Sequence, residues 1–399
     1  MLPIGLITAF TNGLWTPPSR IARNLFATTL VIGAVISCGR MDSNEHGKSI
    51  AIDREVLLSE FKGGAQHIAK LDDGTLIVTG TGRTAWVIAT NANGELLWKY
   101  VDPFNEMNSE RAISQSVFHG IAPLSNGNIL FCGEINAGLK TNLIVILSRD
   151  GHLVERRSEV PEIDKSLSWS TFYRIEHVTN GMLLLSPVLR DGNGFHWIVR
   201  LDNAGKTIGQ SFFNFTDQIS ASSPRFDFTI DLVGADNRDW KLYGVSLQGN
   251  IAAARQLKLN SVSSSFTTQL RSVRAPASAQ FVTFPVGANP ILYTFSDRLE
   301  DAVPPLEIFN IDTTQGVGYA LPDRSIAMFG RTSTAAIAWL DPAGKAEAIR
   351  VFNSGYQSYT IKDAVALSAT QFVAIRDGVA NNPVDAGVLM DWVTLNQKP

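Results

Sequence analysis

A gap-free repeat constrains the fold of this 399-residue chain more than any other feature. Three segments, residues 66–74, 119–127 and 173–181, align along their whole length, and each ends in Asp-Gly or Asn-Gly. Such dipeptides supply the positive φ angles of a tight β-hairpin turn. An apolar run follows each of them, and the three glycines stand 53 and then 54 residues apart (74, 127 and 181). The pattern predicts hairpins that recur at a nearly constant period.

A second element recurs in the same order, as an apolar strand followed by a polar turn that ends in Gly. It occupies residues 86–94, 143–151, 197–205 and 336–344. Each unit therefore holds four consecutive strands joined by hairpins, and such units of about 40–50 residues are typical of a β-propeller. The seven units are expected to begin near residues 63, 116, 170, 224, 266, 315 and 359.

The two ends of the repeat region complement each other. The seventh unit stops one strand short, after the apolar run at 387–394, and residues 50–58 precede the first unit without belonging to it. Pairing of these ends would remove the last exposed sheet edges. We therefore predict an all-β fold, a seven-bladed β-propeller whose ring is closed by the N-terminal strand that completes the last blade. A pair of β-sandwiches or a solenoid is the alternative.

The first 37 residues have the layout of a secretion signal. Arg20 and Arg23 precede an uncharged run at 25–37, and basic residues before a short apolar segment are typical of such signals. The run has thirteen residues, whereas a membrane-spanning helix needs about 20. It ends in Val35-Ile36-Ser37-Cys38, which resembles the lipobox of bacterial lipoproteins. An uncleaved signal anchor is the alternative.

The lipobox resemblance implies cleavage before Cys38 and attachment of diacylglyceryl and acyl chains to that cysteine. More than one chain matters physically, because a single acyl chain holds a protein at a membrane only marginally. It divides the chain into a signal peptide (1–37), a lipidated cysteine with a flexible tether (38–48) and the propeller (49–399). By analogy with enteric lipoproteins, Gly39 in place of aspartate favours the outer membrane over the inner one. The resemblance thus implies a periplasm-facing, lipid-anchored protein of the cell envelope.

Composition and motif spacing argue against several classes of function. A formal net charge of −3 offers no electrostatic basis for binding nucleic acid. None of the six histidines has the spacing of a zinc motif. Residues 80–85 match a dinucleotide motif in letters, but a strand follows instead of the helix that phosphate binding requires. We expect no metal and no cofactor, and we find no nucleophile elbow or catalytic triad.

The remaining candidates come from the first strand of each unit, which in a propeller brings side chains to the mouth of the central channel. Aligned positions of this strand carry polar side chains of both charges. The candidate binding residues are His67, His119, Arg174, Arg271, Lys362 and Asp363.

The repeat region, residues 49–399, is similar to the broad class of bacterial periplasmic propellers and matches no named subfamily. Such a ring with a membrane tether and no catalytic constellation favours a non-catalytic protein that binds a protein or polysaccharide partner. An immunity lipoprotein, which neutralises a toxin delivered to the periplasm, is one specific form. A periplasmic glycosidase or lyase is the enzymatic alternative, and it requires two carboxylates from different blades about 5–10 Å apart.

Overall fold

A computed structural model describes residues 47–397 apart from short internal stretches, of which the longest are 104–114, 162–171, 258–268, 296–305, 308–315, 353–360 and 378–386. Between residues 213 and 316 the described features are those of the backbone. Contacts along the chain separate residues 1–43 from a compact unit, Asn44–Pro399. The predicted signal peptide, residues 1–37, and Cys38 lie outside the described residues.

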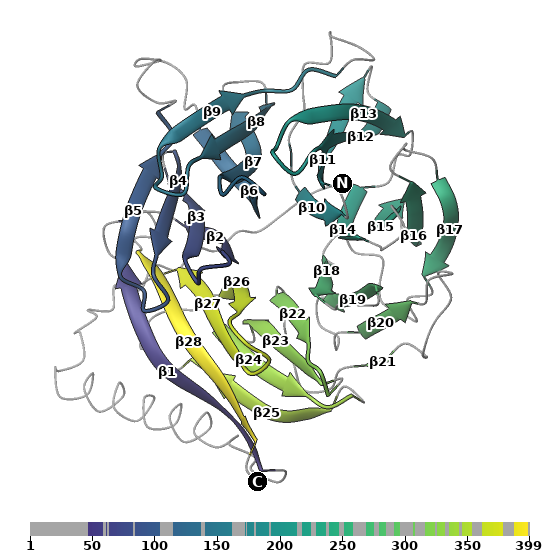
Figure 1. Ribbon diagram of the computed structural model, residues 1–399. Coiled ribbons are helices and arrows are strands. Elements are labelled where there is room, and N and C mark those ends of the chain that lie inside the picture. Colours follow the sequence, from purple (N-terminus) through teal and green to yellow (C-terminus); the bar gives the residue numbers. More distant parts are fainter. Residues whose placement is uncertain are drawn as a thin grey trace, which may run out of the picture. The chain divides into compact units, whose positions relative to one another are not determined.

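The described residues form twenty-eight strands and almost no helix, so the fold is all-β (Figure 1). Four sheets are four-stranded and sequential. They are β2 (Gly64–Lys70), β3 (Leu76–Thr81), β4 (Ala85–Thr90) and β5 (Leu96–Val101); β6 (Gln115–Pro123), β7 (Ile129–Asn136), β8 (Lys140–Leu147) and β9 (Leu153–Arg157); β10 (Arg174–Val178), β11 (Gly181–Arg190), β12 (Asn193–Leu201) and β13 (Thr207–Phe213); and β14 (Gln218–Pro224), β15 (Thr229–Asp236), β16 (Asp239–Ser246) and β17 (Ile251–Leu257).

Two further sequential sets merge into an eight-stranded sheet. They are β18 (Gln269–Arg274), β19 (Ala279–Phe284), β20 (Ile291–Phe295) and β21 (Leu306–Glu307), and β22 (Gly316–Ala320), β23 (Ile326–Arg331), β24 (Ala335–Leu340) and β25 (Ala346–Val351). The junction is a short parallel pairing of β18 with β22 at Val273–Gly318 and Arg274–Tyr319. All other pairs in the described sheets are antiparallel, as consecutive hairpins require.

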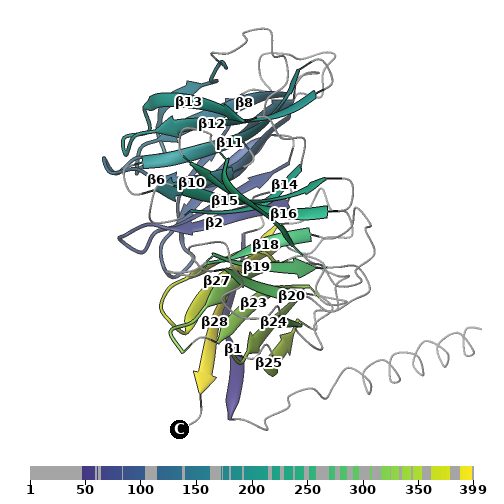
Figure 2. The same cartoon turned by 90° about the vertical axis from the view of Figure 1, so that its right-hand side faces the viewer.

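The last sheet combines the two ends of the described chain. Its order is β1–β28–β27–β26, with β1 (Lys48–Leu58), β26 (Ile361–Ala366), β27 (Gln371–Asp377) and β28 (Val388–Gln397). The register runs from Lys48 opposite Gln397 to Leu58 opposite Val388, so β1 pairs with β28 along its length. The two strands lie side by side in both views (Figures 1 and 2). The N-terminal strand therefore supplies the fourth strand of this sheet, where residues 50–58 were expected.

Four clusters of buried side chains hold neighbouring sheets together. Three clusters take residues from two sets of strands that follow one another along the chain, and the fourth joins the last strands, β26–β28, to the first, β2–β4. The middle strands are covered on both faces, and all six residues of β4 and of β24 are buried. The fourth strand β5 instead alternates between exposed and half-buried residues. The sheets thus pack face to face, which explains why the middle strands read as continuous apolar runs.

The hairpins have the turn geometry that the repeat predicts. Five hairpin glycines have φ between 76° and 87°, a backbone conformation that is unfavourable for other residues: Gly74, Gly94, Gly127, Gly151 and Gly205. In each, the glycine N–H donates to the carbonyl three residues earlier. The third repeat, residues 173–181, differs. There Val178 pairs directly with Gly181, so the turn holds two residues.

Candidate functional site

The candidate site centres on an irregularity that three aligned first strands share, whereas Arg271 at the same position of β18 pairs in regular register with Val282. The register of β2 against β3 shifts between Ala65 and His67, that of β6 against β7 between Phe118 and Gly120, and that of β26 against β27 between Ile361 and Asp363. The extra residues are Gln66, His119 and Lys362, which are three aligned positions of the sequence repeat. A β-bulge re-aims a side chain and increases local twist. The repeat therefore encodes the same local deformation in three sheets.

The bulges lie where first strands of different sheets meet. Strand β2 contacts β26 on one side and β6 on the other, and β6 in turn contacts β10. The side chain of Lys362 is exposed, and that of Gln66 is half-buried. Polar groups from separate sheets are thus collected around the contacts between first strands.

Asp363 of β26 links two sheets at this site through contacts with His67 and with the backbone of β2. The His67 Nδ1 atom lies 3.7 Å from Asp363 Oδ2, with 37% of the imidazole side chain exposed and 7% of the carboxylate side chain exposed. Asp363 Oδ2 also accepts a hydrogen bond from the Ile68 N–H at 3.2 Å, and Oδ1 accepts one from the Ala364 N–H at 2.9 Å. Asp363 therefore lies beside the imidazole while it ties β26 to the backbone of β2.

His119 has a carboxylate partner of its own within one sheet. Its Nε2 atom lies 3.7 Å from Glu134 Oε2 on β7. The imidazole side chain is 29% exposed, and the Glu134 side chain is 8% exposed. Sequence reasoning did not select Glu134. The signal available was a carboxylate inside the otherwise apolar run of β7, where a buried charge requires a polar partner.

The other candidates have different outcomes. Arg174 and Arg271 lie on the first strands β10 and β18, and their side chains fall outside the described part of the structure. Cys38, the candidate for lipidation, lies outside the described residues. Cys132 is buried, as expected of a small apolar core residue, and burial raises the pKa of its thiol. No group of three or more metal-ligating side chains occurs among the residues that the structure describes.

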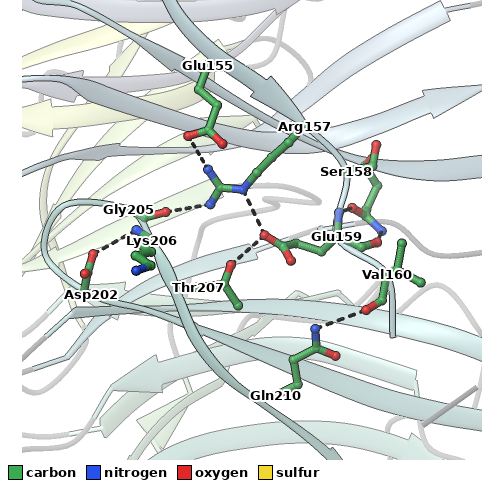
Figure 3. A network of polar contacts seen from close by, with 11 residues as sticks. Glu155, Arg157, Ser158, Glu159, Val160, Asp202, Gly205, Lys206, Thr207 and Gln210 are labelled. Atoms are coloured by element: carbon green, nitrogen blue, oxygen red, sulfur yellow. Dashed lines mark hydrogen bonds and ion pairs between the residues drawn. The ribbon is translucent and has the colours of Figure 1, made fainter. Parts of the chain in front are cut away.

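The polar residues between β6–β9 and β10–β13 form a second network (Figure 3). Arg157 Nε donates to Glu159 Oε1 at 2.9 Å, and its Nη2 donates to the Gly205 carbonyl at 2.6 Å. Thr207 Oγ1 donates to the same Glu159 oxygen at 2.6 Å, and Gln210 Nε2 donates to the Val160 carbonyl at 3.1 Å. The network links groups from two neighbouring sheets, which is typical of a structural clamp.

The site and the sheets define the class of the protein as an all-β repeat protein with polar side chains gathered at its first strands. No protein family matches the sequence, and no curated protein is similar to it. Among solved structures, that of a protein of unknown function from Bacteroides caccae aligns with this chain at a TM-score of 0.39 and 9% sequence identity, over 73% of this chain and 100% of that one. No helix in the described ranges has the length and apolarity of a membrane span.

Proposed function

We propose that residues 49–399 form a closed, seven-bladed β-propeller. The first strands contact one another in the order β2, β6, β10, β14, β18, β22 and β26, and β26 contacts β2 again. Pairing of β1 with β28 supports the same arrangement, because it leaves the last sheet with four strands like the others. In this arrangement the first strands surround the axis, and the bulge residues Gln66, His119 and Lys362 stand at the mouth of the channel.

We propose further that the chain is a lipid-anchored protein of the cell envelope, attached through Cys38, facing the periplasm and residing in the outer membrane. The support is the lipobox-like sequence Val35-Ile36-Ser37-Cys38 after an uncharged run. Radioactive palmitate should label the wild-type protein, and Cys38→Ala should abolish that labelling. Equal labelling of both forms would contradict attachment through Cys38.

The proposed activity is non-catalytic binding of a protein or polysaccharide at the channel mouth. The repeated bulge carries this proposal, because it presents polar side chains from several sheets at equivalent positions. The environment of Asp363 supports binding over hydrolysis. Both of its carboxylate oxygens accept backbone hydrogen bonds, from Ile68 and Ala364, which suits a group that holds two strands together.

Site-specific photo-crosslinking in intact cells tests this activity. A photoreactive amino acid replaces Gln66 or Lys362 at two bulges, and a matched control replaces Asp72, an exposed residue of the β2–β3 hairpin. We expect the same adduct from the two bulge positions and none from position 72. If position 72 gives the same adduct, or if neither bulge position gives one, the channel mouth is not the binding surface.

A further inference from the structure

Exposed aliphatic side chains gather where the fourth strands of three consecutive sheets begin. Leu97 of β5, Val154 of β9 and Ile208 of β13 are 53%, 55% and 56% exposed. Leu96 and Leu153, the first residues of β5 and β9, are also exposed. We call these five residues the aliphatic edge. Scattered apolar residues are normal on a protein surface, whereas repetition at one position of successive sheets requires an explanation.

The position is a β-bulge in each case. The register of β5 against β4 skips Leu97, that of β9 against β8 skips Val154, and that of β13 against β12 skips Ile208. A bulge does not itself require an aliphatic residue. The same position of β25 is Glu347, whose carboxylate pairs with Lys48 of β1. The aliphatic residues in the other three sheets are therefore available for another role.

The chain enters the described unit at the same end of the strands. Leu96 lies opposite Thr90, the last residue of β4, and Lys48 lies opposite Gln397, the last residue of β28. In both sheets the pair joins the last residue of the third strand (β4 or β28) to the first residue of the fourth strand (β5 or β1). Ten residue steps separate Lys48 from Cys38, and a fully extended chain of this length spans at most about 36 Å. A lipid on Cys38 would keep this end of the unit near the membrane surface.

Two features of the edge favour a lipid surface over other partners. The bulges interrupt the free hydrogen-bonding edge of each fourth strand, which opposes the addition of a strand from another protein. Charged neighbours include both signs, such as Glu95 and Lys206, so the edge has no charge complementarity to a polyanion. An anchored chain needs little further affinity for its own membrane, because tethering makes the contact intramolecular.

We propose that the aliphatic edge inserts into the headgroup region of the membrane to which the chain is anchored. This inference rests on the proposed lipid anchor at Cys38. The test uses the lipidated full chain in phosphatidylcholine vesicles that contain a lipid-attached quencher, with a fluorophore on Leu97→Cys. The label enters this position alone, because lipid blocks Cys38 and Cys132 is buried. The matched control is Val101→Cys, which is 54% exposed at the other end of the same strand.

We expect several-fold stronger quenching at position 97 than at position 101, with little dependence on salt. A fluorophore on Ile208→Cys provides a second reading. The fluorophore at position 208 should lose its quenching in a variant that also carries Leu97→Asp and Val154→Asp. It should keep its quenching in a matched variant that carries Val101→Asp and Val160→Asp, because these two residues are exposed to a similar degree but lie outside the aliphatic edge.

Each other outcome is informative. Equal quenching at positions 97 and 101 in protein that floats with the vesicles overturns the aliphatic edge and leaves the anchor standing. Protein that does not float with the vesicles overturns the anchor at Cys38, which is the proposed function itself. A spectral change at position 97 that grows with protein concentration in the absence of vesicles assigns the edge to a second copy of the chain and likewise overturns the lipid contact.

Discussion

Trp98 of β5 donates its indole N–H to the carbonyl of Arg149 in the β8–β9 hairpin of the next sheet, at 2.8 Å. The ring lies against Gly151 of that hairpin, where a Cβ atom would stand 2.6 Å from it. Trp392 of β28 repeats this arrangement with the carbonyl of Ala92 and with Gly94. At the following boundary Arg157 donates to the Gly205 carbonyl instead. A docking contact to the third hairpin of the next sheet thus recurs, while the residue type varies.

Replacement of Trp98 should destabilise the boundary between β2–β5 and β6–β9. We expect Trp98→Phe to lower the free energy of unfolding by about 1 kcal/mol, since it removes one hydrogen bond and keeps most of the packing. Trp98→Ala should cost about 2–4 kcal/mol, because the ring contact with Gly151 is lost as well. Chemical denaturation measures both values. Equal effects of the two variants would mean that the ring contact contributes nothing.

Two hairpin glycines allow the energetic cost of backbone strain to be distinguished from that of a side-chain contact. Gly74 and Gly151 have similar φ values, 87° and 81°, but a Cβ atom at Gly74 meets nothing within 4 Å. Gly74→Ala should therefore cost about 1–2 kcal/mol from the left-handed backbone alone. Gly151→Ala should cost clearly more, because it also displaces Trp98. The difference should vanish in a Trp98→Ala background, and its persistence there would assign it to another cause.

Lys48 should couple β1 to the neighbouring sheet. Its Nζ atom contacts the Glu347 carboxylate, lies 3.9 Å from Asp323 and stands 4.4 Å above the Trp339 ring. Both Lys48 and Glu347 are largely buried, so their pairing is shielded from solvent. A double-mutant cycle of Lys48→Ala and Glu347→Ala should yield a coupling free energy of about 1–3 kcal/mol. A coupling free energy of zero would show that the two side chains act independently.

Asp391 should make stability depend on pH. Arg376 donates to both of its carboxylate oxygens, at 2.7 and 3.2 Å, and also contacts Glu55. Burial raises the pKa of Asp391 to about 6, the neighbouring Glu55 adds to the rise, and Arg376 opposes it. Because the folded-state pKa exceeds the unfolded value of 3.8, the folded protein binds this proton more tightly. Its contribution to stability is complete below about pH 4 and is lost as the pH rises through about 6.

Asp391→Asn removes this titration. Between about pH 4 and 7 the free energy of unfolding should fall less with rising pH in the variant, by up to about 3 kcal/mol. Denaturant titrations at several pH values measure the two slopes. Parallel curves for the variant and the wild type would exclude Asp391 as the titrating group, whatever the difference in absolute stability.

The polar clusters show what the repeat pattern leaves undetermined. The alignment placed Gln66, His119, Arg271 and Lys362 at one position, and a bulge stands there in the first, second and fourth of these strands but not at Arg271. It did not indicate that His119 would face Glu134 on the adjacent strand. It also did not select Arg157 and Glu159. These residues come after the last hairpin of their unit, and the spacing of the repeat does not predict what they contact in the next sheet.

The sequence by itself determined the local architecture. Turn glycines, short apolar runs and their period define hairpins and four-stranded units, and the unpaired run at 50–58 indicated a strand shared with the last unit. The hairpins and the units are short-range properties, since each depends on residues close together in the chain, whereas the shared strand pairs opposite ends of the described chain. The tertiary structure alone decided which side chains meet. His67 and Asp363 are 296 positions apart, and their contact depends on how whole sheets pack face to face, a relation that no local pattern in the chain encodes.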